Sequence, residues 1–106
     1  MNKCIKEKWL RALRSGRYAQ TNGYLHKEVN GQDRFCCLGV LTNLYVEENG
    51  EPEVWNLGNI ILAEEVVEWA ELTDENPHVV IEGTLASLND SGRTFKQIAN
   101  IIEKEL

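Results

Sequence analysis

Two adjacent thiols, Cys36 and Cys37, are the first side chains of this sequence that could do chemistry. A thiol at the start of a helix is a better nucleophile, because the helix dipole stabilises the thiolate. Nucleophilic catalysis also needs a base, and the two histidines, His26 and His78, stand in no recognisable Cys-His pattern. Vicinal cysteines also lack the Cys-x-x-Cys spacing of zinc sites. We therefore expect both thiols to be small core residues, and a cysteine-dependent enzyme is a lesser alternative.

The segment that starts at Arg14 and ends at Gln20 contains the residue types that bind a small phosphorylated or nucleotide ligand. Two arginines provide guanidinium groups for phosphate, a tyrosine provides a face for a base, and a glutamine provides an amide for the edge of that base. A hairpin would return Arg34 to the same place. Alternatively, Tyr18 packs into the core and the arginines cover it with their aliphatic stems. The predicted ligand-binding residues are Arg14, Arg17, Tyr18, Gln20 and Arg34, with no catalytic residue, metal ligand or cofactor.

A polar stretch, Asn89-Asp90-Ser91-Gly92 followed by Thr94, could hold a divalent ion. The same residue types form turns between helices and cap the helix that follows, and we favour this interpretation. The acidic residues at 47–53 and 64–75 lack the spacing of metal-binding loops and indicate a solvated surface. The glycines match no phosphate-binding loop.

The composition indicates a single domain over residues 1–106. A chain of this length buries roughly two thirds of its unfolded surface and needs no disulfide or metal to fold. No apolar run approaches the ~20 residues of a membrane span, and the charged N-terminal residues are not a secretory signal. Three cysteines, two of them adjacent, do not form a paired framework, so we expect reduced thiols and a cytoplasmic location.

Charge is distributed unevenly along the chain. The net charge of −6 argues against generic binding of DNA or RNA. Residues 1–34 hold eight Lys or Arg against three acids, whereas residues 35–106 hold three against fourteen. Either the two segments neutralise each other, within the fold or across the interface of a homo-oligomer, or the basic segment forms a local anion site.

The apolar run that begins at Arg34 is the predicted centre of an α+β fold that is mostly helical. Phe35, Leu38 and Leu41 recur at helical spacing, so we expect a buried helix that contains Cys-Cys-Leu-Gly and ends near Glu48. About four to five helices would pack around this central helix, together with a small β-hairpin or a short antiparallel sheet.

Two elements are predicted before the central helix. Residues 3–15 form an amphipathic helix that Gly16 ends in a left-handed conformation. Residues 24–35 form a hairpin, because Asn30-Gly31 is a strong signal for a two-residue turn.

Several elements are predicted after the central helix. Residues 49–60 form an ordered loop pinned by Trp55 and Leu57, residues 62–72 form a helix with an acidic outer face, and residues 78–83 are extended. Thr84 caps a short helix through Leu88, and Thr94 caps a final helix. The inward residues of that final helix are Phe95, Ile98, Ile101 and Ile102.

Five blocks of this sequence resemble a family of small proteins encoded in tailed-phage and prophage genomes. The blocks are W-L-R-A-L-R-S-G-R-Y-A-Q at residues 9–20, F-C-C-L-G-V-L at 35–41, V-V-E-W-A-E-L at 66–72, L-A-S-L-N-D at 85–90 and F-K-Q-I-A at 95–99. The resemblance covers nearly the whole chain. It implies a phage origin and a life in the cytoplasm of the bacterial host, and it carries no catalytic residue over.

Small phage proteins of this kind are often accessory proteins that interfere with host defence. One class is similar in logic: its members are oligomers that sequester nucleotide second messengers in pockets lined by arginine and aromatic residues. The resemblance therefore implies an anti-defence protein that binds a small anionic or nucleotide-type ligand without catalysis. The alternative is an accessory factor that binds a host protein through the acidic face of residues 64–71.

Overall fold

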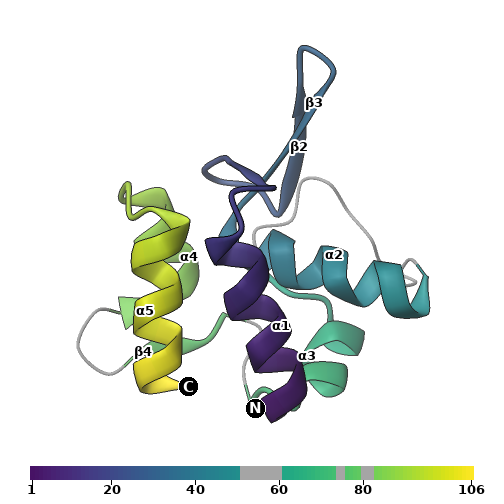
Figure 1. Cartoon of the computed structure of the whole chain (residues 1–106), viewed down its shortest axis with the longest axis vertical. Helices are drawn as coiled ribbons and strands as arrows, with labels where there is room; N and C mark the ends of the chain where they lie inside the picture. The colour runs from purple at the N-terminus through teal and green to yellow at the C-terminus, as the bar shows by residue number, and fades with distance from the viewer. Residues whose placement is uncertain (51–60, 74–75, 80–82) are drawn as a thin grey trace.

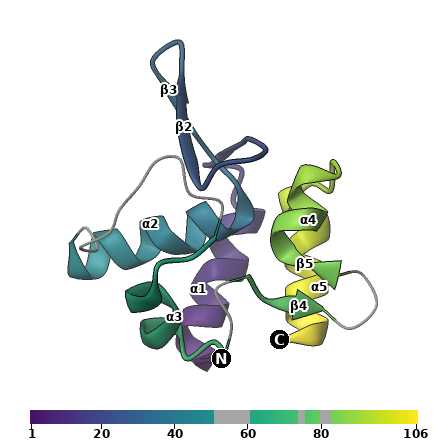
Figure 2. The same cartoon turned by 180° about the vertical axis from the view of Figure 1, so that it is seen from behind.

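The computed structural model describes residues 1–50, 61–73, 76–79 and 83–106, which form five helices and two small sheets (Figure 1). Helix α1 lies between two groups: α2 and α3 on one side, and α4 and α5 on the other (Figure 2). The predicted α+β fold, mostly α, is therefore confirmed.

Helix α1 (Lys3–Arg14) forms where the amphipathic pattern predicted it. The Asn2 side chain caps its start by accepting a hydrogen bond from the backbone N–H of Ile5 at 3.0 Å. Trp9 and Leu13 on the inner face are buried. The helix ends where Gly16 adopts a φ of 78°, a left-handed conformation that costs glycine little.

The next residues form a three-stranded sheet with the order β1-β3-β2. Strand β1 (Ala19–Gln20) pairs parallel with β3 (Gln32–Phe35), and β2 (His26–Val29) pairs antiparallel with β3. The predicted hairpin is confirmed, and it projects from the helical body (Figure 1). Its register places Lys27 opposite Arg34 and Glu28 opposite Asp33. Like charges thus face each other at two successive positions of the hairpin.

Helix α2 (Cys37–Asn49) is the central helix that the apolar run predicted. Its first six residues are all buried, and the indole N–H of Trp9 on α1 donates to the carbonyl oxygen of Cys37 at 2.9 Å. Cys36 is the N-cap residue, so Phe35 belongs to strand β3 and not to this helix. The spacing that placed Phe35 on the helix was misleading, because a continuous apolar run satisfies strand and helix periods alike.

Helix α3 (Glu64–Ala70) is shorter at both ends than the predicted helix over residues 62–72. It ends at Glu71, which adopts a left-handed φ of 56°. Trp69 packs against Tyr45 of α2 with ring centroids 5.4 Å apart. Most of the predicted loop over residues 49–60 lies outside the described residues.

Two-residue strands β4 (His78–Val79) and β5 (Gly83–Thr84) pair antiparallel, and the rest of the predicted extended segment lies outside the described residues. Thr84 caps helix α4 (Leu85–Asp90), which runs two residues further than predicted. Thr94 and Gln97 form a reciprocal capping box at the start of helix α5 (Phe95–Glu105). The inward face of α5 is as predicted, except that Ile101 is only half-buried.

Candidate functional site

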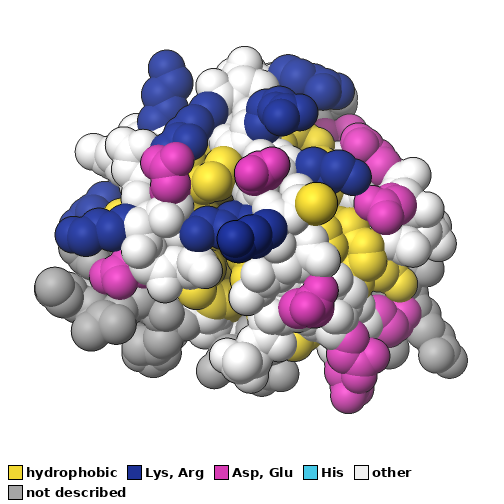
Figure 3. All heavy atoms as spheres, turned by 60° about the horizontal axis from the view of Figure 1, so that its bottom comes forward, with side chains coloured by type: hydrophobic (Ala, Val, Ile, Leu, Met, Phe, Trp, Pro, Cys, Tyr) yellow, Lys and Arg dark blue, Asp and Glu magenta, His cyan; other side chains and the backbone are white. Residues whose placement is uncertain are grey.

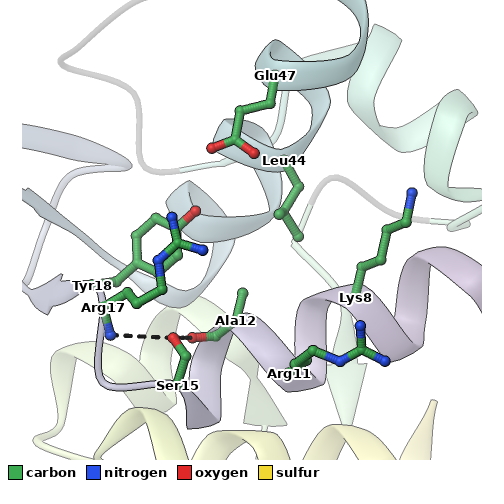
Figure 4. Close-up of a pocket in the computed structure, with 8 residues that line it drawn as sticks. All are labelled: Lys8, Arg11, Ala12, Ser15, Arg17, Tyr18, Leu44 and Glu47. Carbon is green, nitrogen blue, oxygen red and sulfur yellow. Dashed lines mark hydrogen bonds between the residues drawn. The ribbon is translucent and has the colours of Figure 1, made fainter.

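A surface pocket of about 340 Å³ lies between α1 and α2 (Figure 4). Its walls come from the outer face of α1, from the segment that follows α1, and from one turn of α2. The residues that line it are Lys8, Arg11, Ala12, Ser15, Arg17, Tyr18, Leu44 and Glu47. The sequence predicted Arg17 and Tyr18 as ligand-binding residues, and the structure brings these two together in this pocket.

The backbone at the end of α1 positions Arg17. The Ser15 hydroxyl donates to the carbonyl oxygen of Ala12 at 2.7 Å and accepts from the N–H of Arg17 at 3.1 Å. With Gly16 in its left-handed conformation, the chain turns back over the end of the helix. The side chains of Arg17 and Tyr18 therefore point toward α2 (Figure 4).

Tyr18 is half-buried and serves both the core and the pocket. Its ring packs edge-on against Phe35, with centroids 5.2 Å apart. Its hydroxyl accepts from the side-chain amide of Asn43 at 2.9 Å, and the same amide donates to Glu47 at 3.2 Å. Because a tyrosine hydroxyl both donates and accepts, its own proton remains for another acceptor. The prediction of core packing and the prediction of a binding face are compatible for this residue.

Positive charge dominates the pocket. Lys8 pairs with Glu48 at 3.6 Å, but this pair is exposed and therefore weak. Arg11 and Arg17 are exposed and form no ion pair with any of the described residues. The described part of the pocket lining thus holds three cations and one carboxylate, and two of the cations have their guanidinium donors available for an anion.

Arg14 points away from this pocket. Its guanidinium donates to the Asn100 side chain at 2.9 Å and to the Glu103 carboxylate at 3.0 Å, both on α5. This contact with Arg14 lowers the pKa of the Glu103 carboxyl below its ordinary value. Although Arg14 and Arg17 are close in sequence, they face different helices, and Arg14 ties α1 to α5.

Gln20 and Arg34 also lie outside the pocket. The Gln20 side-chain amide donates to Asn89 at 2.8 Å and to the carbonyl oxygen of Arg93 at 2.7 Å. Arg34 reaches the carbonyl oxygen of Gln20 at 3.5 Å. Of the five predicted residues, the structure therefore brings two together and engages the other three in contacts within the protein. Lys8, Arg11 and Glu47 were not predicted, since each lies on a helix face that reads as ordinary charged surface.

Asn89 is a buried polar residue whose side chain forms hydrogen bonds with several segments of the chain, a role that the sequence did not predict. We interpreted it as a turn residue, but it lies within α4 and is fully buried. Its side-chain oxygen accepts from the Cys37 N–H at 3.1 Å and from Gln20, and its amide donates to the carbonyl oxygen of Thr21 at 2.7 Å and to Asn22 at 3.4 Å. The turn interpretation was wrong for this residue because the groups it satisfies are distant in sequence.

The adjacent thiols are core residues, as predicted. Cys36 is 4% exposed and Cys37 is 0% exposed. Cys36 accepts from the Gly39 N–H at 3.4 Å, and the Cys37 thiol donates to the carbonyl oxygen of Leu85 at 3.6 Å. Burial raises the pKa of both thiols, so both stay protonated near neutral pH. This opposes the role of a thiolate nucleophile. Within the described ranges, no group of three or more His, Cys, Asp or Glu could hold a metal ion.

We expect alkylation to distinguish the three thiols. Iodoacetamide at pH 8 should label only the exposed Cys4 in the folded protein, and all three thiols after unfolding in urea, as counted by intact mass. Fast labelling of Cys36 or Cys37 in the folded protein would contradict their assignment to the core.

The two buried thiols should also make the free energy of unfolding depend on pH. Because the pKa of each thiol is raised above its ordinary value of 9.0, the free energy of unfolding should be unaffected by these thiols below that pH and should fall as the pH rises above it.

A family model described as "Domain of unknown function (DUF8296)" matches residues 1–106. The chain belongs to this family. The match spans the whole sequence. It bears on neither the five blocks nor the phage origin that the resemblance implied, and both stay predictions. No curated protein and no solved structure matches the chain.

None of the helices in the described ranges is long and apolar enough to cross a membrane. The cytoplasmic location predicted from the cysteines stays a prediction.

Proposed function

We propose that this protein binds a small anionic ligand in the pocket between α1 and α2 and does so without catalysis. One observation carries this proposal: the exposed guanidinium groups of Arg11 and Arg17 line the same pocket as the half-buried ring of Tyr18. Arginine forks bind phosphate oxygens, and a tyrosine face accommodates a planar group. The volume of about 340 Å³ falls within the range of small-molecule sites.

A role in blocking host defence is the biological setting that we propose for this binding. It depends on the phage resemblance, and it makes nucleotide second messengers the first ligands to test. The buried, protonated thiols favour binding over a cysteine-dependent reaction.

A second candidate is binding of a host protein through α3. Glu64 and Glu68 are exposed on this helix and Glu71 is exposed directly after it, and none of the three pairs with a cation among the described residues. Exposed carboxylates of this kind raise the rate of encounter with a basic surface. If no small ligand binds to the protein, this acidic surface is the next one to test.

The proposed anion site is tested by comparing Arg17→Ala with Arg14→Ala in thermal unfolding with nucleotides, cyclic dinucleotides and inorganic pyrophosphate. A ligand at 100-fold its dissociation constant stabilises the folded state by about 2.7 kcal/mol, which should raise the melting temperature by several degrees. Arg17→Ala should weaken binding by about tenfold or more, because it removes charge-assisted hydrogen bonds. Arg14→Ala should leave affinity unchanged, since Arg14 contacts α5 instead of the pocket.

The two variants remove the same charge from neighbouring positions, so each controls for the other. Equal losses in both variants would mean that the net positive charge of α1 attracts the ligand without a defined site. No shift of the melting temperature with any of these ligands would overturn the proposal.

A further inference from the structure

Among the described residues that line the pocket, Glu47 is the one carboxylate. It projects from α2 toward the wall formed by Arg17 and Tyr18 (Figure 4). The Asn43 amide holds its Oε1 atom at 3.2 Å, and the same amide holds the Tyr18 hydroxyl. Within the described part of the chain, Glu47 forms no ion pair with Arg11 or Arg17, although all three line the same hollow.

Glu47 thus places an acceptor on the side of the pocket formed by Arg17 and Tyr18, and Arg11 lies on the other side (Figure 4). A ligand that is only an anion would meet the guanidinium groups and be repelled by Glu47. A ligand that also carries hydroxyl or amino groups would donate hydrogen bonds to the carboxylate, and such charge-assisted bonds are about twice as strong as neutral ones. Beside these charged groups, Tyr18 and Leu44 offer an apolar surface for a ring. The pocket thus fits a ligand that carries an anionic group, a ring and hydrogen-bond donors.

We propose that Glu47 makes this pocket selective for nucleoside phosphates over simple phosphates: Arg11 and Arg17 bind the phosphate, and Glu47 accepts hydrogen bonds from the hydroxyl or amino groups of the nucleoside. This inference rests on the proposed function. It goes further by assigning the ligand class and by making Glu47 a specificity-determining residue. On the face of the molecule that Figure 3 shows, Lys and Arg side chains are interspersed with Asp and Glu side chains, so neither charge covers it.

Titration calorimetry with adenosine monophosphate and with inorganic phosphate tests this assignment on the native chain and on Glu47→Gln. The native chain should bind the nucleotide at least about tenfold more tightly than inorganic phosphate, the difference expected of one good hydrogen bond to a charged group. In Glu47→Gln, affinity for inorganic phosphate should rise, because a repulsive charge is removed, while the nucleotide should lose most of its advantage. Glu64→Gln on α3 removes the same charge outside the pocket and should change neither affinity.

The outcomes separate the two proposals. Equal tightening of both ligands in Glu47→Gln would show that this carboxylate is only a counter-charge, and the inference would be overturned while the anion site stands. Equal affinity of the native chain for the two ligands would overturn it as well. No binding of either ligand to the native chain would overturn the anion site together with the inference.

Discussion

Gly39→Ala should lower the free energy of unfolding by more than about 3 kcal/mol, the upper part of the range for overpacked cores. A β-carbon built at residue 39 would lie 1.7 Å from the carbonyl oxygen of Leu25 and 2.6 Å from its carbonyl carbon. The same carbonyl accepts from the Cys36 N–H at 3.2 Å, so it is fixed against the first turn of α2. Backbone cannot move aside as a flexible side chain can, and the helix must shift or the hydrogen bond must break.

The expected sign is the reverse of the ordinary effect of this substitution. Alanine inside a helix is favoured over glycine by about 1 kcal/mol, so a solvent-facing site would gain stability. Urea unfolding followed by circular dichroism measures the difference. Gly16→Ala is the control, because its β-carbon meets nothing within 4 Å and only its φ of 78° opposes it, at a cost of about 1 kcal/mol. If Gly39→Ala proved no more harmful than Gly16→Ala, the close approach of α2 to Leu25 would be wrong.

Asn89→Ala should cost about 4 kcal/mol of stability, because it removes all four hydrogen bonds of one buried side chain at once. The N–H of Cys37 at the start of α2, the amide of Gln20 in β1 and the carbonyl oxygen of Thr21 all contact this one side chain. The side chain of Asn89 thus connects α4 to α2 and to the segment that contains Gln20 and Thr21. Thermal unfolding should show a drop in melting temperature well above that of an ordinary surface change.

Asn100→Ala is the matched control for this result. Asn100 is exposed on α5 and its side chain accepts one hydrogen bond, from Arg14 at 2.9 Å. Its removal should cost less than about 1 kcal/mol, since water replaces the lost partner. Similar losses in the two variants would mean that Asn89 acts as an ordinary surface residue and that its burial has been misjudged.

The elements that local sequence determines were predictable. The amphipathic pattern of residues 3–15 that ends at Gly16, Asn30-Gly31 between two short extended runs, and Thr94 before the final helix each define an end, a turn or a start through neighbouring residues. Such signals depend only on contacts a few positions away, and the structure has the corresponding elements with small differences at their ends.

The residues that sequence reasoning missed depend on distant contacts. Asn89 has the sequence context of a turn residue, and its role depends on its hydrogen bonds with Cys37 and Gln20. Gly39 has no local reason to be glycine, and its role depends on the nearby carbonyl of Leu25. Only two of the five predicted ligand-binding residues lie together in the pocket, for a related reason. Only two residues lie between Arg14 and Arg17, but the turn at Gly16 is one of them and sends the two side chains to different helices.

The charge register of the β2–β3 hairpin also bears on aggregation. In the described sheet, β2 is an edge strand, and an open edge can act as a template for pairing with another copy. If two copies of β2 paired antiparallel and symmetrically, the residues opposite each other would have to lie on the same face of the sheet. The two-fold axis of such a pair would therefore pass through one residue position, and that residue would lie opposite its own copy. A pair centred on Lys27 would place it opposite a second Lys27, and a pair centred on Glu28 would place it opposite a second Glu28. These two registers bring like charges together beside the like pairs already present within the hairpin, so both are disfavoured.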